Sequence, residues 1–360
     1  MLKTDLPTKA KTKTKTILKK IMHVFDIKAN DREPRMFDNV SGILFWDNIN
    51  NDKYNEIHDE MMSKFWIPKE VSMAGDGVHW NGKMSDEEKE MYKTGIGVLA
   101  TLDSVSTYFD KIASDYIQDS AIKACMSFVA AMETIHNKSY TYTMSSLVSK
   151  EESIEAFERP KKLRSVAKRN DLIMNVFDTF IAEPTVENFA KSLVAMSGLE
   201  GVAFVNGFTP FYYLNDNGKM IGTGSIIQFI QRDETLHTDL QTTIVNDICE
   251  QYPEDIDRSE FEKWCHEFFT KLVELEREFC KELYTDIYDI DVDEVCEFIG
   301  YRANVVLDNL RMKKIFAAKR NPMAWIEAFN PDNLNNVKTD FFEDKERNYQ
   351  KTTSNGWEFL

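Results

Sequence analysis

The feature that most constrains the fold is a short motif, Glu-x-x-His, that occurs twice within long helical sequence patterns. Glu133 and His136 form the first copy, and Glu234 and His237 form the second. Side chains three or four residues apart lie on one face of a helix, so each pair shares a face, and Tyr140 extends the first stripe by one turn. The chain has only six histidines. A lone Glu-x-x-His is usually a solvated surface pair, so the surrounding sequence decides what two copies mean.

Helical patterns dominate the chain from residue 85 onward. Ser85 and Glu88 form a capping box at the start of the first long run. We expect helices over residues 85–118, 120–148, 154–181, 186–214, 225–252, 258–285 and 292–318, with Ser225 as the cap of the fifth. No convincing strand alternation appears in the sequence. Helices of about 25–30 residues are well above the globular mean, which favours an all-α bundle of long helices.

Composition divides the chain into four parts. Residues 1–30 are expected to be a disordered basic tail, since the first 20 residues contain seven lysines and one aspartate. Residues 31–84 mix aromatic residues with polar turns and are interpreted as an arm that packs on the helical domain, residues 85–325. Residues 326–360 are polar and are interpreted as a flexible C-terminal tail. Its last apolar residues, Trp357, Phe359 and Leu360, fit either ordinary fraying or docking into a groove of a partner.

Charge and composition exclude several classes of function. The net charge of −16 argues against binding nucleic acid, which requires a basic face. No apolar run approaches the roughly 20 residues of a membrane span. The five cysteines are an odd number without a C-x-x-C pair, which favours free thiols in a reducing compartment. No secretory signal or arginine-rich transit peptide is visible, so we expect a cytoplasmic protein.

Single carboxylates on two further helices complete a recognisable pattern. Asp103 lies in the first expected helix, and Glu200 lies in the fourth, within the small and apolar run from Met196 to Phe204. Two single carboxylates and two Glu-x-x-His motifs on four helices are the arrangement of dinuclear carboxylate bundles. Four carboxylates and two neutral imidazoles balance two divalent cations, whereas unpaired acids in a core would be strongly destabilising. Oxygen-rich ligation with one nitrogen per metal favours iron or manganese.

These motifs resemble the radical-generating small subunit of class I ribonucleotide reductase over roughly residues 60–350. The core of the resemblance consists of Leu102-Asp103-Ser104, the segment Glu133 to Tyr140, Leu199-Glu200 with Phe204 and Phe208, and Arg232-Asp233-Glu234 with His237. The family's arm and tail are resembled by Phe65-Trp66 with Glu70-Val71 and by Phe341-Phe342-Glu343 with Tyr349-Gln350. Metal positions, a tyrosine and a tryptophan in the same order make the match specific.

The resemblance implies a ferritin-like bundle with a dinuclear metal site in its core. Asp103, Glu133 and His136 would hold one metal, and Glu200, Glu234 and His237 would hold the other, with bridging carboxylates. Two iron ions are expected, although dimanganese and mixed manganese–iron sites use nearly the same ligands. Tyr140 would carry a stable tyrosyl radical, with Phe204, Phe208 and Ile230 shielding it or simply filling the core. A relay would run through His136, Asp233 and Trp66 to a tail tyrosine, here Tyr349.

The implied function is that of the small subunit of ribonucleoside-diphosphate reductase, a homodimer that works with a large catalytic subunit. A di-iron oxygenase or desaturase on the same bundle is the alternative and also explains six ligands. Those enzymes usually have glutamate at the first ligand position and need a substrate cavity, so Asp103, Tyr140 and Trp66 favour the radical subunit. Iron storage predicts a much shorter chain, and a non-enzymatic scaffold leaves the buried acids unexplained.

Overall fold

The structure is a computed structural model that describes residues 15–18, 36–37, 44, 46 and 49–329. Most of the expected basic tail and nearly all of the expected C-terminal tail, including Tyr349 and Trp357, lie outside the described residues. Residues 15–18 lie against the loop that precedes α7 (Val186–Gly198), where the Val186 amide donates to the Lys15 carbonyl at 3.0 Å. Ile17 is buried there.

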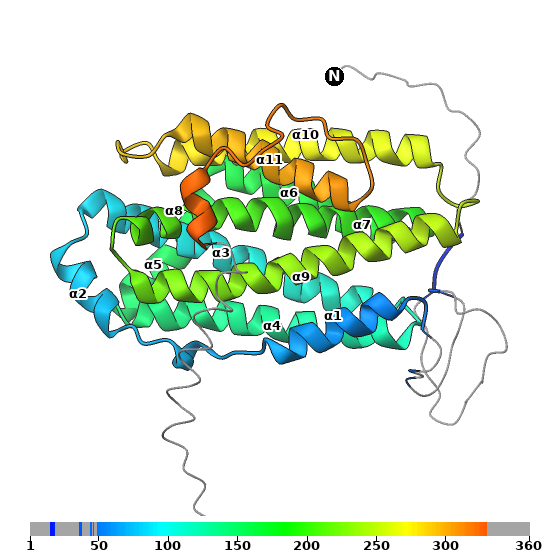
Figure 1. Cartoon of the computed structure of the whole chain (residues 1–360), viewed down its shortest axis with the longest axis horizontal. Coiled ribbons are helices and arrows are strands. Elements are labelled where there is room, and N and C mark those ends of the chain that lie inside the picture. Colours follow the sequence, from blue (N-terminus) through cyan, green and yellow to red (C-terminus); the bar gives the residue numbers. More distant parts are fainter. Residues whose placement is uncertain (1–14, 19–35, 38–43, 45, 47–48, 330–360) are drawn as a thin grey trace, which may run out of the picture.

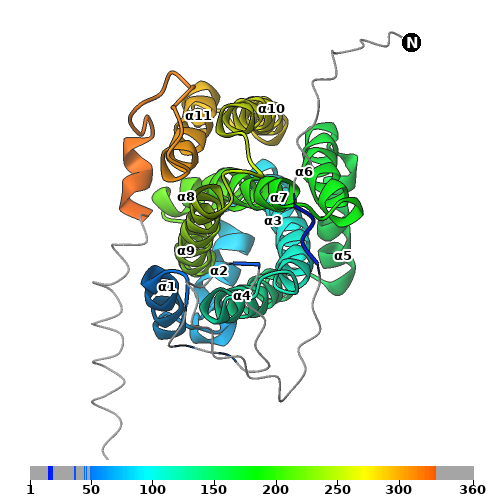
Figure 2. The same ribbon diagram turned by 90° about the vertical axis from the view of Figure 1, so that its right-hand side faces the viewer.

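Four helical columns surround a common axis, as the end-on view of Figure 2 shows. They are α3 (Asp86–Ala113), α4 (Ser120–Ser145), α9 (Ile221–Gln251), and a column in which α7 continues through η3 (Leu199–Phe204) into α8 (Val205–Asp216). Their apolar stripes turn toward this axis and form one continuous core. The interior of this bundle is where the candidate ligands lie.

Further helices cover the outside of the four columns (Figure 1). α10 (Arg258–Leu283) and α11 (Val292–Asn309) pack on one side, and α5 (Lys150–Glu158) and α6 (Arg164–Ala182) pack on another. The arm supplies α1 (Asp52–Ser63), the turn η1 (Pro68–Glu70) and α2 (Ala74–Gly82), and η4 (Ala324–Phe329) ends the described part. None of the described helices is long and apolar enough to cross a membrane.

The expected all-α fold is confirmed. Within the described residues the only β pairing is a single bridge between Thr16 and Thr185, which belongs to no strand. The capping box also forms as expected: the Ser85 hydroxyl accepts from the Glu88 amide, and the Glu88 carboxylate accepts from the Ser85 amide. All five cysteines are free thiols.

Several helix boundaries expected from the sequence are wrong. The helix expected over 154–181 is two helices, α5 and α6, separated by the 3₁₀ turn η2 (Arg159–Lys162). Pro160 causes the break, because proline lacks an amide donor and its ring clashes with the preceding turn. The first and last expected helices end early, at Ala113 and Asn309 instead of 118 and 318. The fourth is interrupted by the π-helical turn η3.

The fifth expected helix begins earlier than its predicted cap. α9 starts at Ile221, and Ser225 lies inside its first turn, where its hydroxyl donates to the Ile221 carbonyl. The capping acceptor comes from α2 instead. The Asp76 carboxylate accepts hydrogen bonds from the amides of Gly222 at 2.8 Å and Thr223 at 2.7 Å, and from the Thr223 hydroxyl. A cap supplied from a distant segment has no local sequence signature.

Candidate metal centre

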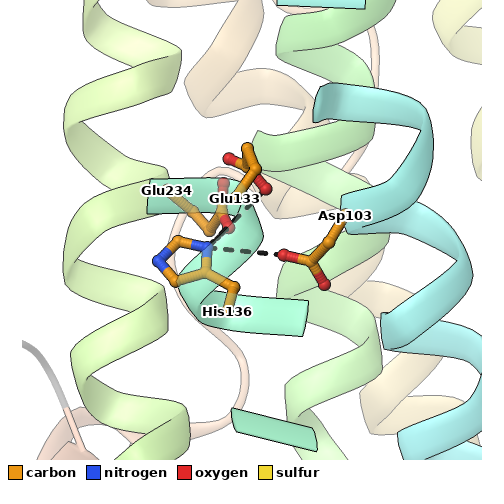
Figure 3. Close-up of side chains that lie close together, drawn as sticks. All are labelled: Asp103, Glu133, His136 and Glu234. Atoms are coloured by element: carbon orange, nitrogen blue, oxygen red, sulfur yellow. Dashed lines mark ion pairs between the residues drawn. The ribbon is translucent and has the colours of Figure 1, made fainter. Parts of the chain in front are cut away.

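The structure brings all six predicted metal ligands together in the bundle core. They come from four elements: Asp103 from α3, Glu133 and His136 from α4, Glu200 from η3, and Glu234 and His237 from α9. None is more than 1% exposed to solvent. Figure 3 shows four of them, with the carboxylates of Asp103, Glu133 and Glu234 converging on the His136 ring. Helices that are remote in sequence therefore build one polar site in an apolar interior.

The six side chains form two overlapping sets of potential ligands. One set contains Asp103, Glu133, His136 and Glu234, and the other contains Glu133, Glu200, Glu234 and His237; within each set the ligand atoms lie within 4.8 Å of one another. Glu133 and Glu234 belong to both sets. A carboxylate has two oxygens and can join two cations, so these two glutamates would be the bridging ligands of a dinuclear centre.

Each imidazole presents Nδ1 to the carboxylates. His136 Nδ1 lies 3.1 Å from Glu234 Oε1 and 3.4 Å from Asp103 Oδ1. His237 Nδ1 lies 3.0 Å from Glu133 Oε1 and 3.3 Å from Glu234 Oε2. Both rings therefore direct the same nitrogen at the space between the acids, as two equivalent metal ligands would.

Burial and mutual repulsion dominate the electrostatics of the acids. Burial, followed by the charge of Glu234, raises the pKa of Glu200 well above its usual range. Burial, with Glu133 and Glu234 nearby, raises the pKa of Asp103 as well. Burial alone would also raise the pKa of Glu133, but its contacts with His136 and His237 lower it to about 2. Without metal ions, the site therefore reduces its negative charge by retaining protons.

The imidazoles show the complementary shift. Burial alone would lower the pKa of His136, but its contacts with Asp103 and Asp233 raise it well above its usual range. The pKa of His237 is raised in the same way by Glu133 and Glu234. Since metal ions bind deprotonated ligands, cations entering this site would displace these protons.

Unsatisfied polar atoms show that the residues fit a pair of cations. Both oxygens of Asp103 and of Glu133, and one oxygen each of Glu200 and Glu234, are buried without a hydrogen-bond partner among the described residues. Buried polar atoms are almost always paired, so such a concentration of exceptions requires an explanation. The oxygen-rich donor set with one nitrogen per site suits iron or manganese.

The expected relay residues are in contact. Asp233 Oδ2 accepts a hydrogen bond from the Trp66 indole Nε1 at 2.7 Å and lies 3.2 Å from His136 Nε2. The other oxygen of Asp233 accepts from Arg232 Nη2 at 3.1 Å. The Trp66 and His136 rings are also stacked, with their centroids 6.2 Å apart. Asp233 thus contacts the ring nitrogen of His136 that points away from the other acids and so fixes the orientation of the ring. Such a carboxylate partner of a histidine ligand is a recurring feature of metal sites.

Tyr140 and its expected apolar neighbours are fully buried. Tyr140 lies one turn beyond His136 on α4, and its hydroxyl has no hydrogen-bond partner among the described residues. Burial, followed by the charges of Asp103 and Glu234, raises the pKa of Tyr140 well above its usual range. Phe204, Phe208 and Ile230 are each 0% exposed. Tyr349, the remaining predicted site residue, lies outside the described part of the chain.

Sequence reasoning missed two polar residues of the centre. Gln241, one turn beyond His237 on α9, donates a hydrogen bond to Glu200 Oε2. Asp110, two turns beyond Asp103 on α3, is buried and contributes to the raised pKa of Glu200, after burial and other ligands. Both continue a ligand-bearing helix face at spacings of four and seven residues, so the sequence pattern puts them on that face without showing that they are buried.

Fold and site together define a class of protein: a helical bundle with a dinuclear carboxylate centre in its core. Comparison with known proteins identifies the family. Residues 44–322 match the family model "Ribonucleotide reductase, small chain". The chain is 35% identical over 323 residues to the ribonucleoside-diphosphate reductase subunit beta of Halalkalibacterium halodurans, covering 89% of this chain and 92% of the relative. The chain therefore belongs to the small-chain family of ribonucleotide reductase, and it is an oxidoreductase subunit.

Solved structures agree with the fold. The ribonucleotide reductase R2 subunit from Clostridium botulinum superposes with a TM-score of 0.81 at 24% identity, covering 88% of this chain and 99% of that one. The Streptococcus sanguinis dimanganese(II)-NrdF superposes with a TM-score of 0.71 at 23% identity, covering 80% and 98%. These likenesses confirm the expected helical bundle.

Proposed function

We propose that this chain is the radical-generating small subunit of a ribonucleoside-diphosphate reductase. It would oxidise Tyr140 to a stable tyrosyl radical and pass the oxidising equivalent to a separate large subunit that reduces ribonucleotides to deoxyribonucleotides. The observation that carries the proposal is the position of the phenol. Tyr140 is 0% exposed and lies on the same stripe of α4 as Glu133 and His136. Only a residue beside the centre and sealed from water could keep a radical.

The proposed ligands divide into two groups. Asp103, Glu133 and His136 would hold one ion, and Glu200, Glu234 and His237 the other, with Glu133 and Glu234 bridging. We propose two iron ions. A dimanganese or a manganese–iron pair is the alternative, supported by the donor set and by the name of the dimanganese relative. When bound, the ions would react with dioxygen and so provide the oxidising power for the reaction.

The protein environment of Tyr140 determines its protonation state before the radical forms. Because burial and the nearby acids raise the pKa of Tyr140, the phenol keeps its proton at neutral pH. Formation of a neutral tyrosyl radical therefore removes one electron and one proton together. After burial, the charge of Asp103 is the one that acts most strongly on the pKa of this phenol. Phe204, Phe208 and Ile230 would exclude water and reductants from the radical.

The proposed path out of the centre is the hydrogen-bonded series His136, Asp233 and Trp66. One oxygen atom, Asp233 Oδ2, contacts both neighbours, so the series is continuous from a metal ligand to the indole. Trp66 is fully buried, whereas Phe65 and Ile67 on either side of it are 50% and 42% exposed. The chain therefore reaches the surface on both sides of Trp66, while its indole contacts the acid that touches a proposed metal ligand. Tyr349 would continue the path toward the large subunit, and we expect the small subunit to be a homodimer.

The main alternative, an oxygenase or desaturase on the same bundle, needs a substrate cavity at the metals. Two surface cavities of the described structure have volumes of about 630 and 400 Å³. The first lies between the end of α9 and the start of α10, and the second lies among α6, α7 and α10. None of the six proposed metal ligands lines either of these two cavities, and Tyr140, Phe204, Phe208 and Ile230 are fully buried. This burial favours the radical subunit.

Electron paramagnetic resonance tests the proposal. Ferrous-loaded protein exposed to oxygen is expected to show a tyrosyl signal, and Tyr140→Phe is expected to abolish it because phenylalanine has no oxidisable hydroxyl. Tyr212→Phe is the matched control: Tyr212 is also fully buried, but its hydroxyl donates to Gln231, so this variant should keep the signal. A tyrosyl signal that persists in Tyr140→Phe would remove Tyr140 from the proposal.

A further inference from the structure

Helix α3 carries a polar stripe that extends beyond its proposed metal ligand. Asp103, Ser106 and Asp110 are spaced by three and four residues, so they share one face of the helix. All three are buried, and Asp110 is 1% exposed. Asp110 Oδ2 and the Ser106 hydroxyl lack hydrogen-bond partners among the described residues. The proposed ligand roles account for Asp103 but not for the acid two turns further along.

A structural role does not explain Asp110. A carboxyl group that is buried with an unsatisfied oxygen destabilises a fold, and an apolar residue of the same shape would fill the space better. No ion pair or side-chain hydrogen bond of Asp110 is found in the described part of the chain. Natural cores retain such groups mainly where a ligand or water supplies the missing partner.

Asp110 lies on the same face of α3 as Asp103, and the groups that act on its pKa belong to one set of the potential ligands. After burial, the groups that act most strongly on the pKa of Asp110 are Glu133, His237 and Glu234. Asp110 in turn raises the pKa of Glu200. These four residues are the set that could hold the second ion, and neither Asp103 nor His136 is among the groups that act on Asp110. Asp110 belongs to neither set of close ligand atoms, so it is not itself one of these potential ligands.

We propose that Asp110 is an outer carboxylate of the metal centre, which accepts a hydrogen bond from a water molecule bound to the ion at Glu200 and His237. This inference rests on the proposed function, because it requires that ion. Iron and manganese ions complete their coordination with water, and water on a dication is a strong hydrogen-bond donor. Gln241 holds Glu200 from α9, so Asp110 on α3 and Gln241 fix different ligands of the same ion.

Two substitutions separate the possible roles of Asp110. Asp110→Leu keeps the branched shape but removes both charge and acceptor, whereas Asp110→Asn keeps one acceptor oxygen. We expect the leucine variant to bind one of the two Mn²⁺ ions up to about 100-fold more weakly, and the asparagine variant about 10-fold more weakly. The metal-free leucine variant should unfold at the same or a higher temperature, because the unpartnered acid is gone. Mn²⁺ binding is measured from the electron paramagnetic resonance signal of the free ion, and unfolding is measured by circular dichroism.

The control is Glu276→Gln. Glu276 is an equally buried acid, but Arg169 and Asn206 are its partners and it belongs to neither set of potential ligands. Its loss should therefore lower the unfolding temperature and leave the Mn²⁺ affinity unchanged. Wild-type affinity for both ions in folded Asp110→Leu would overturn the inference, and so would equal losses in the two Asp110 variants. If the leucine variant does not fold, an unchanged Mn²⁺ affinity of Asp110→Asn is enough by itself to overturn the inference. If the wild-type chain fails to bind two ions, the proposed metal centre itself is refuted, which is a different result.

Discussion

The Trp66 indole shows how one side chain can be a packing residue and a functional group at once. Its ring packs on Phe229, with centroids 5.3 Å apart, and stacks on His136, while its only polar atom is satisfied by Asp233. Sequence alone makes a buried tryptophan an ordinary core residue. The hydrogen bond to an acid that also contacts a ligand histidine is what gives Trp66 a place on the proposed path.

Trp66→Phe is therefore expected to separate radical formation from radical transfer. Phenylalanine keeps the stacked ring but loses the Nε1 donor, so the metals and the Tyr140 signal should remain while turnover with the large subunit stops. Asp233 would lose one donor but keep Arg232, so the loss of stability should be about 1–3 kcal/mol. Electron paramagnetic resonance measures radical formation, and an assay of deoxyribonucleotide formation measures turnover. Near-normal turnover would take Trp66 off the path.

At the scale of single residues, the ligands were predictable and their outer partners were not. Glu133, His136, Glu234 and His237 follow a fixed spacing that any helix translates into a shared face. Asp233 was identified only through family resemblance. Asp110 and Gln241 were missed, because a single acid or amide on an amphipathic helix is usually a surface residue. Only the packing of α3 and α9 around the centre reveals that these side chains point inward.

At the scale of elements, the sequence predicted the existence of the helices better than their ends. Pro160 was available in the sequence and divides α5 from α6, so that error was avoidable. The π-helical turn at Glu200 was not, since π turns have no simple sequence pattern and commonly occur at functional sites. Gly201 shows its tertiary origin: a β-carbon there would lie 2.5 Å from a Val306 methyl, so α11 and η3 are in close contact.

The cap of α9 gives a prediction at this scale. Asp76→Ala removes the acceptor for two amides and a hydroxyl at the start of α9, and we expect a loss of about 2 kcal/mol in the free energy of unfolding. Metal affinity should be nearly unchanged, because Glu234 is three turns further along the helix. Chemical unfolding and Mn²⁺ titration measure these quantities. Asp86→Ala, an exposed acid in the first turn of α3, is the control and should change stability little.

At the scale of the whole molecule, metal binding and folding are linked. Ions that bind the folded chain alone stabilise it by about 2.7 kcal/mol each at concentrations about 100 times Kd. Folding raises the pKa of both imidazoles, so their protonation stabilises the metal-free fold below the unfolded pKa of about 6.5. That stabilisation is lost as the pH rises through the folded pKa. Metal binding has the opposite dependence, because it requires deprotonated ligands.

We therefore expect the increase in unfolding temperature on adding Mn²⁺ to be small near pH 5.5 and to grow toward pH 7.5. Differential scanning calorimetry with and without the ion measures it. His237→Ala removes one ligand and should reduce the increase at every pH. An increase that is the same at both pH values would contradict the displacement of protons by the ions.

The distribution of the ligands along the chain has a consequence for biosynthesis. Asp103 is translated well before Glu234 and His237, and the acids meet only when α9 packs against α3 and α4. A nascent chain that ends before α9 lacks two of the six proposed ligands, Glu234 and His237, and Glu234 is one of the two proposed bridging glutamates. The centre can therefore form only once the polypeptide extends through α9 and that helix has packed against α3 and α4. No shorter local segment of the chain can bind both ions by itself.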